Sequence, residues 1–411
     1  MVSKIDIEQA YENVKGNVIE TPLRRAQVFS DLAGCDMLLK METQQMSGAF
    51  KERGALNRLL QLSEEEKKRG IIAASAGNHA QGVAYHAHRM GIRAVIVMPE
   101  STPLVKVTGV QFWGAEVILH GTSYDDAYAL SRELEHRQGL VYVHPFADPW
   151  VIAGQGTIAI EVLDHELGAD LDAIVVPIGG GGLIAGIGAY VKRVRPDVKV
   201  IGVEVEGFAC MKDSLAAGAV QTLVGTNTIA DGIAVKRVSE NTFALCRDYV
   251  DEIVTVTDDE ISNAILMLLE YEKVVVEGAG AVAVAALLNK KIGGVAGKKV
   301  VSVVSGGNID ITMLSRIIDR GLEFGGRIAQ FSTPLKDSPG ALEKVLGIIR
   351  KAGANILEVY QHRYSKDVPV GEVNVSFTIE TRNRQHIAEI ESQLRVAGYE
   401  VFRSHWKPSE D

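Results

Sequence analysis

Short apolar runs alternate with longer amphipathic segments from about residue 35 to residue 320. The runs hold almost no polar positions, which is typical of strands buried on both faces of a parallel sheet. Residues 78–89 and 122–137, between such runs, repeat apolar side chains at helical spacing. The predicted strands are Met37–Lys40, Ile71–Ser75, Ala94–Met98, Glu116–Leu119, Ala173–Pro177, Lys199–Glu204, Glu252–Val256 and Lys299–Ser305. The pattern predicts an α/β fold, with mainly parallel sheets and helices on both faces, in two lobes of which the smaller covers roughly residues 45–150.

The pattern changes near residues 321–326, which separates a predicted domain of residues 1–320 from one of residues 326–411. Ser338 is expected to cap the first helix of this second domain, with Pro339 at the first helical position. The element order is βαββαβ, that of a ferredoxin-like unit. Its strands are expected at Arg327–Leu335, Asn355–Arg363, Gly371–Glu380 and Glu400–Arg403.

Composition and charge are those of an ordinary globular protein. Of 411 residues, 46% are hydrophobic and 23% are charged, and Lys+Arg 43 against Asp+Glu 52 leaves a net charge of −9. These values exclude a disordered chain and offer no basic surface for nucleic acid. The amino-terminal residues lack an apolar export segment, and no apolar stretch approaches the ~18 residues of a membrane span. We therefore expect a cytoplasmic protein that binds neither nucleic acid nor membrane.

Cysteines and histidines show no metal-binding pattern. Cys35, Cys210 and Cys246 are far apart without a CxxC pair, and they are expected to be buried thiols in a reducing compartment. His86 and His88 are two positions apart on a predicted helix, so their side chains point in different directions. The sequence therefore predicts no metal site.

Four consecutive glycines, Gly179, Gly180, Gly181 and Gly182, follow a predicted strand and begin a helical segment. Glycines there let the backbone approach an anion closely, and the helix amino terminus presents free N–H groups and a partial positive charge. The run predicts a phosphate site, although a tight structural turn would use the same residues.

The glycine run also fits a dinucleotide fingerprint. Gly180 and Gly182 are followed by Ala185, and Glu204 ends the next predicted strand, where it could bind a ribose. From this pattern alone an NAD-dependent oxidoreductase is an alternative. Glu204 could equally be a structural carboxylate at the end of a strand.

Three further polar segments lie where predicted strands end or helices begin. Ser47–Ala55 contains Lys51 after an aromatic residue, Ser75–Gly82 lies at a strand-to-helix junction, and Ser305–Asn308 ends the last strand of the region. A lysine in a protein-lined pocket can lose its proton and form a Schiff base. Such a lysine together with a phosphate cradle suggests pyridoxal phosphate as cofactor.

These motifs occur together in one known family. The fold-type II pyridoxal-phosphate enzymes have, in this order and spacing, the motifs Thr21-Pro22-Leu23, SGAFKERGA, SAGNHAQG, GGGG and SGGN. Over about residues 5–320 the chain most resembles the threonine dehydratases, also called threonine ammonia-lyases or threonine deaminases. The tail, with Asp337-Ser338-Pro339-Gly340 and Gly353-Ala354-Asn355-Ile356, resembles an ACT domain, a small amino-acid-sensing module.

The resemblance implies a role for each motif. Lys51 would be the Schiff-base lysine and general base, Phe50 would pack on the cofactor ring, Asn78 would bind the phenolic oxygen and Ser305 the pyridine nitrogen. Further cofactor contacts would come from Gly179, Gly180, Gly181, Gly182, Gly232 and Glu277. The loop that receives the substrate carboxylate would be Ser75, Ala76, Gly77 and His79. For Glu277, an ordinary helix-capping carboxylate is the alternative.

The resemblance implies a β-elimination that converts L-threonine to 2-oxobutanoate and ammonia, and L-serine to pyruvate. A serine-racemase-like enzyme is the alternative. Ala76 stands where the related racemases have a second catalytic serine, and racemisation needs a proton donor on each face of the substrate. Cys210 stands where their divalent-metal site has an acidic residue. Ser305 cannot ion-pair with the pyridine nitrogen, which favours expulsion of the β-hydroxyl over transamination.

The resemblance of the tail implies regulation by an amino acid bound between paired copies. The effector would contact Asp337, Gly340, Asn355 and Ile356, and isoleucine or valine is expected for an enzyme of isoleucine biosynthesis. The chain would form a homodimer or homotetramer. A tail that only oligomerises is the alternative for this domain, and a non-catalytic amino-acid sensor is the alternative for the chain.

Overall fold

The computed structural model describes residues 4–225, 227–363 and 368–403. It divides into two compact units, residues 1–314 and 315–411. The division falls inside helix α14 (Ile311–Phe324), earlier than the boundary predicted near residues 321–326. One reason is that Arg384, in the second unit, donates a hydrogen bond from Nη2 to the carbonyl of Phe324 at 2.8 Å.

The first unit contains two sheets. One has six strands in the order β1-β2-β10-β7-β8-β9, all parallel except β1, and the other has four parallel strands in the order β5-β4-β3-β6. The strands are β1 (Leu23–Arg25), β2 (Asp36–Met41), β3 (Ile71–Ala74), β4 (Ala94–Met98), β5 (Glu116–Leu119), β6 (Val141–Tyr142), β7 (Ala173–Pro177), β8 (Lys199–Val205), β9 (Glu252–Val256) and β10 (Lys299–Val304). All eight predicted strands are confirmed. Sequence analysis missed β1 and β6, which are too short to show a period.

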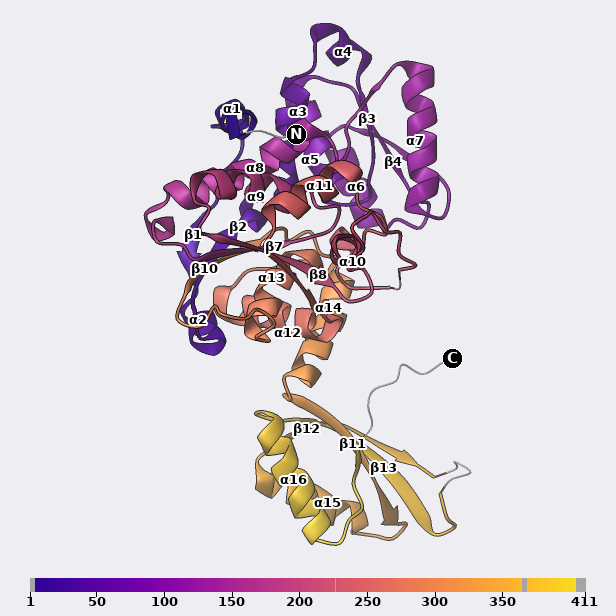
Figure 1. Ribbon diagram of the computed structural model, residues 1–411. Helices are drawn as coiled ribbons and strands as arrows, with labels where there is room; N and C mark the ends of the chain where they lie inside the picture. The colour runs from indigo at the N-terminus through magenta and orange to yellow at the C-terminus, as the bar shows by residue number, and fades with distance from the viewer. Residues whose placement is uncertain (1–3, 226, 364–367, 404–411) are drawn as a thin grey trace. The chain divides into compact units, whose positions relative to one another are not determined.

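The helices cover both faces of the six-stranded sheet. In Figure 1, α9 and α13 lie on opposite sides of β7 and β8. The helical segments are α1 (Lys4–Val14), α2 (Gln27–Ala33), η1 (Glu42–Gln44), α3 (Lys51–Leu60), α4 (Glu64–Arg69), α5 (Asn78–Met90), α6 (Leu104–Phe112), α7 (Tyr124–Gln138), α8 (Pro149–Asp164), η2 (Glu166–Gly168), α9 (Gly182–Val194), α10 (Cys210–Ala217), η3 (Asp231–Ile233), α11 (Glu240–Tyr249), α12 (Asp258–Met267), η4 (Leu268–Glu272) and α13 (Gly278–Leu288). None of the described helices is long and apolar enough to cross a membrane.

The predicted polar segments follow the carboxyl ends of parallel strands. Ser75 follows β3, the four glycines follow β7 by one residue, and Ser305 follows β10. Every residue of β3, β4 and β7 is buried, as expected for strands covered on both faces. In open α/β sheets ligands bind outside the carboxyl ends of the strands, so the fold places these segments where a site is expected.

The second unit is one four-stranded antiparallel sheet with two helices. The elements are β11 (Ile328–Lys336), α15 (Ala341–Ala352), β12 (Asn355–His362), β13 (Glu372–Glu380), α16 (Arg384–Val396) and β14 (Phe402–Arg403), so the predicted order βαββαβ is confirmed. The strands lie in the order β12-β13-β11-β14. In β13 buried and partly exposed residues alternate, and α15 and α16 lie side by side on one face (Figure 1).

The predicted start of the first helix in this unit is wrong. Helix α15 begins at Ala341, and Gly340, with a φ of +82°, takes the position that we predicted for Ser338. Because only glycine adopts a positive φ at little cost, the turn is closed by Gly340 and the helix starts two residues later than predicted. Pro339 therefore lies in the turn.

Candidate active site

Lys51 is the first residue of α3, and its side chain reaches the loop that follows the carboxyl end of β6. The Nζ atom donates a hydrogen bond to the carbonyl of Pro145 at 2.8 Å and lies 5.2 Å from the centre of the Phe50 ring. Burial lowers the pKa of Lys51 to about 8, although the nearby carboxylate of Glu277 acts in the opposite direction. A lysine with this pKa is partly neutral near pH 8 and can act as a base or nucleophile.

The segment before Lys51 is held by the segment after β10. The amide of Phe50 donates to the carbonyl of Ser305 at 3.0 Å, and the amide of Gly307 donates to the carbonyl of Gly48 at 2.9 Å. A Cβ atom on Gly306 would lie 3.0 Å from the Cβ of Ala49, so glycine is needed for this approach. The lysine motif and the SGGN motif, which are about 250 residues apart, thus lie side by side.

Three polar side chains beside these two segments are linked by hydrogen bonds. Asn78, at the start of α5, donates from Nδ2 to Oε1 of Glu277 at 2.5 Å, and Asn308 donates from Nδ2 to Oδ1 of Asn78 at 2.9 Å. Burial and the carboxylate of Asp231 raise the pKa of Glu277 to about 7, against the effects of Asn78, Lys106 and Lys51. Glu277 precedes α13 but does not cap it through its side chain, so the capping alternative is wrong.

The tetraglycine turn forms a close-packed cradle at the start of α9. Gly181 has a φ of +87°, and no described side chain caps the helix, so its first N–H groups are open to a ligand. A Cβ atom on Gly180 would lie 2.2 Å from Cγ of the Phe146 ring. Glycine is therefore required here by the close approach of Phe146.

Pro145 and Phe146 connect the lysine to the cradle. The carbonyl of Pro145 accepts the hydrogen bond of Lys51, and the next residue packs against Gly180 and Gly182. Sequence analysis missed both residues. The available signal was their position in the loop after the short strand β6, which was not predicted. Since a desolvated lysine and open helix amides lie on either side of Pro145 and Phe146, the residues fit an aldehyde cofactor with a phosphate group.

The remaining residues predicted for the cofactor also line this region. Ser305 is buried and directs Oγ toward the carbonyl of Ala279 at 3.4 Å. A Cβ atom on Gly232 would lie 3.8 Å from Oε1 of Glu277 and 3.1 Å from the Cβ of Ala279. These positions are close to the chain of polar side chains described above.

The loop predicted to receive the substrate carboxylate lies between β3 and α5. The amide of Gly77 donates to Oγ of Ser75 at 3.3 Å, and Ala76 between them has no polar side chain. The Nε2 atom of His79 is 2.8 Å from the carbonyl oxygen of Val143, and its Nδ1 atom has no hydrogen-bond partner among the described residues. Burial and Lys51 lower the pKa of His79 to about 3, so the ring is neutral. Its side chain thus holds the loop to the strand end beside it.

Glu204 does not lie where a dinucleotide would need it. Its buried carboxylate accepts the amide N–H groups of Met211 at 2.8 Å and of Lys212 at 2.9 Å, and so it holds the first turn of α10. Burial raises its pKa to about 7, while these two bonds lower it. Both oxygens are occupied, so the ribose-binding role is wrong and the structural alternative is correct.

Cys210, the residue at the position of the racemases' metal site, points Sγ at backbone carbonyls of Gln221 and Lys236. Within the part of the chain that the structure describes, no three His, Cys, Asp or Glu side chains gather as a metal site would require. All three cysteines are free and buried.

The four residues predicted to bind an effector do not meet within one copy of the second unit. Asp337 and Gly340 lie after β11, near the Glu372 end of β13, whereas Asn355 pairs with Glu380 at its other end. These ends are roughly 27 Å apart along the strand. A hollow near the first end is lined by Leu335, Lys336, Asp337, Ser338, Ala341, Leu342, Gln361, Arg363, Val373 and Val375.

Comparisons with known proteins agree with this geometry. Residues 14–306 match the family model described as pyridoxal-phosphate dependent enzyme. The L-threonine ammonia-lyase of Thermotoga maritima is 49% identical over 401 residues, which cover 98% of this chain and 99% of that protein. The solved threonine deaminase isoform 2 of Solanum lycopersicum is 40% identical with a TM-score of 0.71, covering 77% of this chain and 86% of its own. Maize serine racemase is 35% identical with a TM-score of 0.73, covering 78% of this chain and 98% of its own.

Proposed function

The chain belongs to the family of pyridoxal-phosphate-dependent enzymes, and on this premise we propose that it deaminates L-threonine to 2-oxobutanoate and ammonia. L-Serine is converted to pyruvate by the same chemistry. The observation that carries the proposal is 49% identity, over 98% of this chain, to a protein named L-threonine ammonia-lyase. The cofactor is pyridoxal 5′-phosphate.

Each part of the site has a task. When bound, pyridoxal phosphate supplies an electron sink for the negative charge that develops as the α-proton leaves. The free amides at the start of α9 hold the phosphate, and the desolvated Nζ of Lys51 accepts the α-proton. Asn78 and Glu277 form a fixed hydrogen-bonded pair near Lys51, and the uncharged hydroxyl of Ser305 would hold the pyridine nitrogen.

Elimination is favoured over racemisation by the side chain of Ala76. The similarity to a solved serine racemase makes racemisation the second candidate. Racemisation needs a proton donor on the face of the substrate opposite the lysine, and Ala76 occupies the position that the resemblance implies for it. An alanine methyl group holds no exchangeable proton.

The second unit acts as an ACT domain that binds isoleucine or valine and regulates the first unit. Its one-sided sheet and the hollow that contains Asp337 and Arg363 support this role. Because Asn355 and Ile356 lie at the opposite end of the sheet from Asp337 and Gly340, a site made of all four needs two copies of the chain. The chain therefore works as a homodimer or homotetramer. Free, buried cysteines agree with a site of action in the reducing cytoplasm.

One assay tests the catalytic proposal. Ketoacid release from L-threonine and from L-serine is measured with purified protein saturated with pyridoxal phosphate, with and without isoleucine and valine. We expect turnover of L-threonine and a change of rate with at least one effector. Interconversion of L- and D-serine without ketoacid release would establish the racemase instead, and a rate that ignores both effectors would leave the second unit with an oligomerising role.

A further inference from the structure

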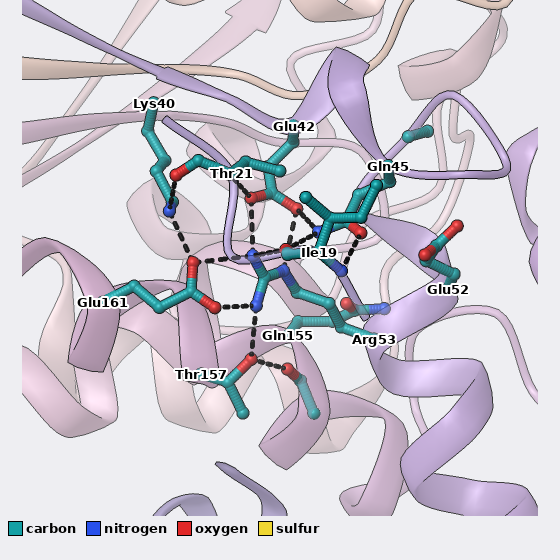
Figure 2. A network of polar contacts seen from close by, with 12 residues as sticks. Ile19, Thr21, Lys40, Glu42, Gln45, Glu52, Arg53, Gln155, Thr157 and Glu161 are labelled. Atoms are coloured by element: carbon teal, nitrogen blue, oxygen red, sulfur yellow. Dashed lines mark hydrogen bonds and ion pairs between the residues drawn. The ribbon is translucent and has the colours of Figure 1, made fainter. Parts of the chain in front are cut away.

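A fully buried group of charged side chains lies beside the catalytic lysine. Lys40, Glu42, Arg53 and Glu161, which we call the buried quartet, are 1%, 0%, 0% and 5% exposed. Two positive charges thus face two negative charges in the interior. Figure 2 shows Arg53 between the two carboxylates, with Lys40 beside Glu161.

Arg53 makes forked hydrogen bonds to both carboxylates. Its Nε and Nη2 donate to Oε2 and Oε1 of Glu42, each at 2.8 Å, and its Nη1 and Nη2 donate to Oε1 and Oε2 of Glu161 at 2.5 and 2.8 Å. Lys40 donates from Nζ to Oε2 of Glu161 at 2.5 Å, and Thr21 donates from Oγ1 to Oε1 of Glu42 at 2.6 Å. Because the guanidinium is planar and rigid, it fixes the directions of Glu42 and Glu161 relative to each other, which a lysine ammonium does not do.

The quartet joins four elements, of which α8 is distant in sequence from the other three. Arg53 lies in the first turn of α3, two residues after Lys51, while Lys40 is in β2, Glu42 is in η1 and Glu161 is in α8. A buried charge that loses its partner is strongly destabilising, so a shift of any of these elements that separates the ion pairs is costly. The first turn of α3 is thereby locked to α8.

Helix α8 is in turn packed directly on α9, whose amino terminus is the tetraglycine cradle. A Cβ atom on Gly154 would lie 2.6 Å from Cα of Gly54 in α3, and a Cβ atom on Gly156 would lie 2.9 Å from the carbonyl oxygen of Gly186 in α9. These contacts bring the backbones of three helices together. Helix α8 thus sets where α3, with Lys51, lies relative to the cradle.

We propose that Arg53 is a positioning residue which, through Glu42 and Glu161, holds Lys51 at its working place relative to the phosphate cradle. This inference rests on the proposed function, since it requires that Lys51 binds the cofactor. Arg53 itself is fully buried among its partners and touches neither Nζ of Lys51 nor the tetraglycine turn through any hydrogen bond described above.

The environment of Lys51 supplies a readout of this positioning. Three groups from other segments interact with Lys51: the carboxylate of Glu277 before α13 acts to raise the pKa of Lys51 against the effect of burial, and the charge of Lys51 in turn lowers the pKa of His79 in α5 and of His144 after β6. Both histidines are neutral, because burial lowers their pKa to about 3 and about 4. If the first turn of α3 shifts, Nζ leaves the carbonyl of Pro145 and gains water, and the pKa of Lys51 moves up from about 8.

Three variants test the proposal. R53K keeps the positive charge but loses the paired hydrogen bonds to the two carboxylates. E161Q keeps the shape of Glu161 but removes the negative charge that binds Arg53. The matched control is R58M, because Arg58 also lies in α3 and donates to Asp148 at the start of α8, at 2.8 Å, but is nearly two turns away from Lys51. For each apoprotein we would measure the dissociation constant of pyridoxal phosphate and the pH dependence of its covalent attachment to Lys51.

We expect R53K and E161Q to bind the cofactor at least tenfold more weakly and to shift the pH midpoint of attachment upward by one unit or more, with R58M unchanged. Unchanged affinity and midpoint in both R53K and E161Q would overturn the proposal, even if both proteins melt at lower temperature. An equal shift in R58M would also overturn it, since α3 would then act only as a packed helix. If R53K does not fold, E161Q decides. A wild-type protein that never attaches the cofactor would instead refute the proposed function.

Discussion

The two units of this protein treat polar groups differently. The first unit buries many of them, including the quartet, Glu204, Glu277 and His79, and each carboxylate of these is tied to a specific donor. Among residues 315–363 and 368–403, the buried polar residues are Thr333, Thr381, His386 and Glu391. The second unit also leaves the edge strand β12 largely exposed. On the proposed function this difference is expected, because a site that moves protons needs desolvated groups at fixed positions, whereas a unit proposed to bind effectors or copies of itself needs accessible surface.

The largest expected effect comes from removing the amine of Lys51. K51A should lower ketoacid release from L-threonine by at least ~10⁴-fold, because the variant loses both the base and the covalent attachment point. Thermal unfolding of the second unit should not change. The measurement is single-turnover ketoacid formation at saturating pyridoxal phosphate. Dehydratase activity within tenfold of the wild type would remove Lys51 from the mechanism.

A methyl group added to the cradle should weaken the binding of pyridoxal phosphate and leave the stability of the second unit unchanged. In G180A the new Cβ would lie 2.2 Å from Cγ of Phe146. Overpacking of this kind costs about 1–3 kcal/mol, so the affinity for pyridoxal phosphate should fall by up to ~100-fold. Fluorescence titration of the apoprotein measures it. G293A is the control, because a Cβ at Gly293 meets nothing within 4 Å. Equal affinities in both variants would contradict the assignment of the cradle.

Acid should weaken the first unit through its neutral histidines. His86 is fully buried, and burial, with a smaller effect of Arg89, lowers its pKa to about 3 from 6.5. A lowered pKa contributes stability that is complete above pH 6.5 and is lost as the pH falls toward 3, since the unfolded chain then binds the proton. H86L removes this dependence, so its gain in unfolding free energy over the wild type should be about 2 kcal/mol larger at pH 5 than at pH 7.

Urea unfolding followed by tryptophan fluorescence at the two pH values provides this comparison. Activity per folded protein at pH 7 is the control, because His86 lies in α5 eight positions after Asn78 and is none of the residues assigned to the site. A difference between H86L and the wild type that is the same at both pH values would show that His86 is protonated, or solvated, in the folded protein.

The smallest effect is expected for a glycine of the second unit. A Cβ atom at Gly347, inside α15, meets nothing within 4 Å, in contrast to Gly180. Since alanine has the higher helix propensity, G347A should stabilise the second unit by up to about 1 kcal/mol and leave turnover unchanged. Differential scanning calorimetry of the full chain measures the change. Destabilisation would mean that the surface over Gly347 is covered in the assembled protein.

Much of the fold, and the candidates for the reacting residues, followed from sequence. Each apolar strand shows in its own short stretch of sequence. Lys51, Asn78 and the glycine run likewise belong to short motifs that can be recognised without knowing their contacts. Strand β6, with two residues, was too short to show a pattern, and the loop after it, which connects Lys51 to the cradle, was missed with it. Glu204 was ambiguous for a related reason: its position after a strand is local, but its partners Met211 and Lys212 are set by how the chain turns back.

By itself the sequence determined which segments become strands and helices and which side chains are candidates for the chemistry, because both depend on residue type and on near neighbours. The tertiary structure alone decided what holds them in place. Arg53 and Glu161 are 108 positions apart, and nothing near either residue indicates that they form a desolvated pair. Charges are buried only when long-range folding brings their partners into contact, so the positioning of Lys51 is a property of the folded chain.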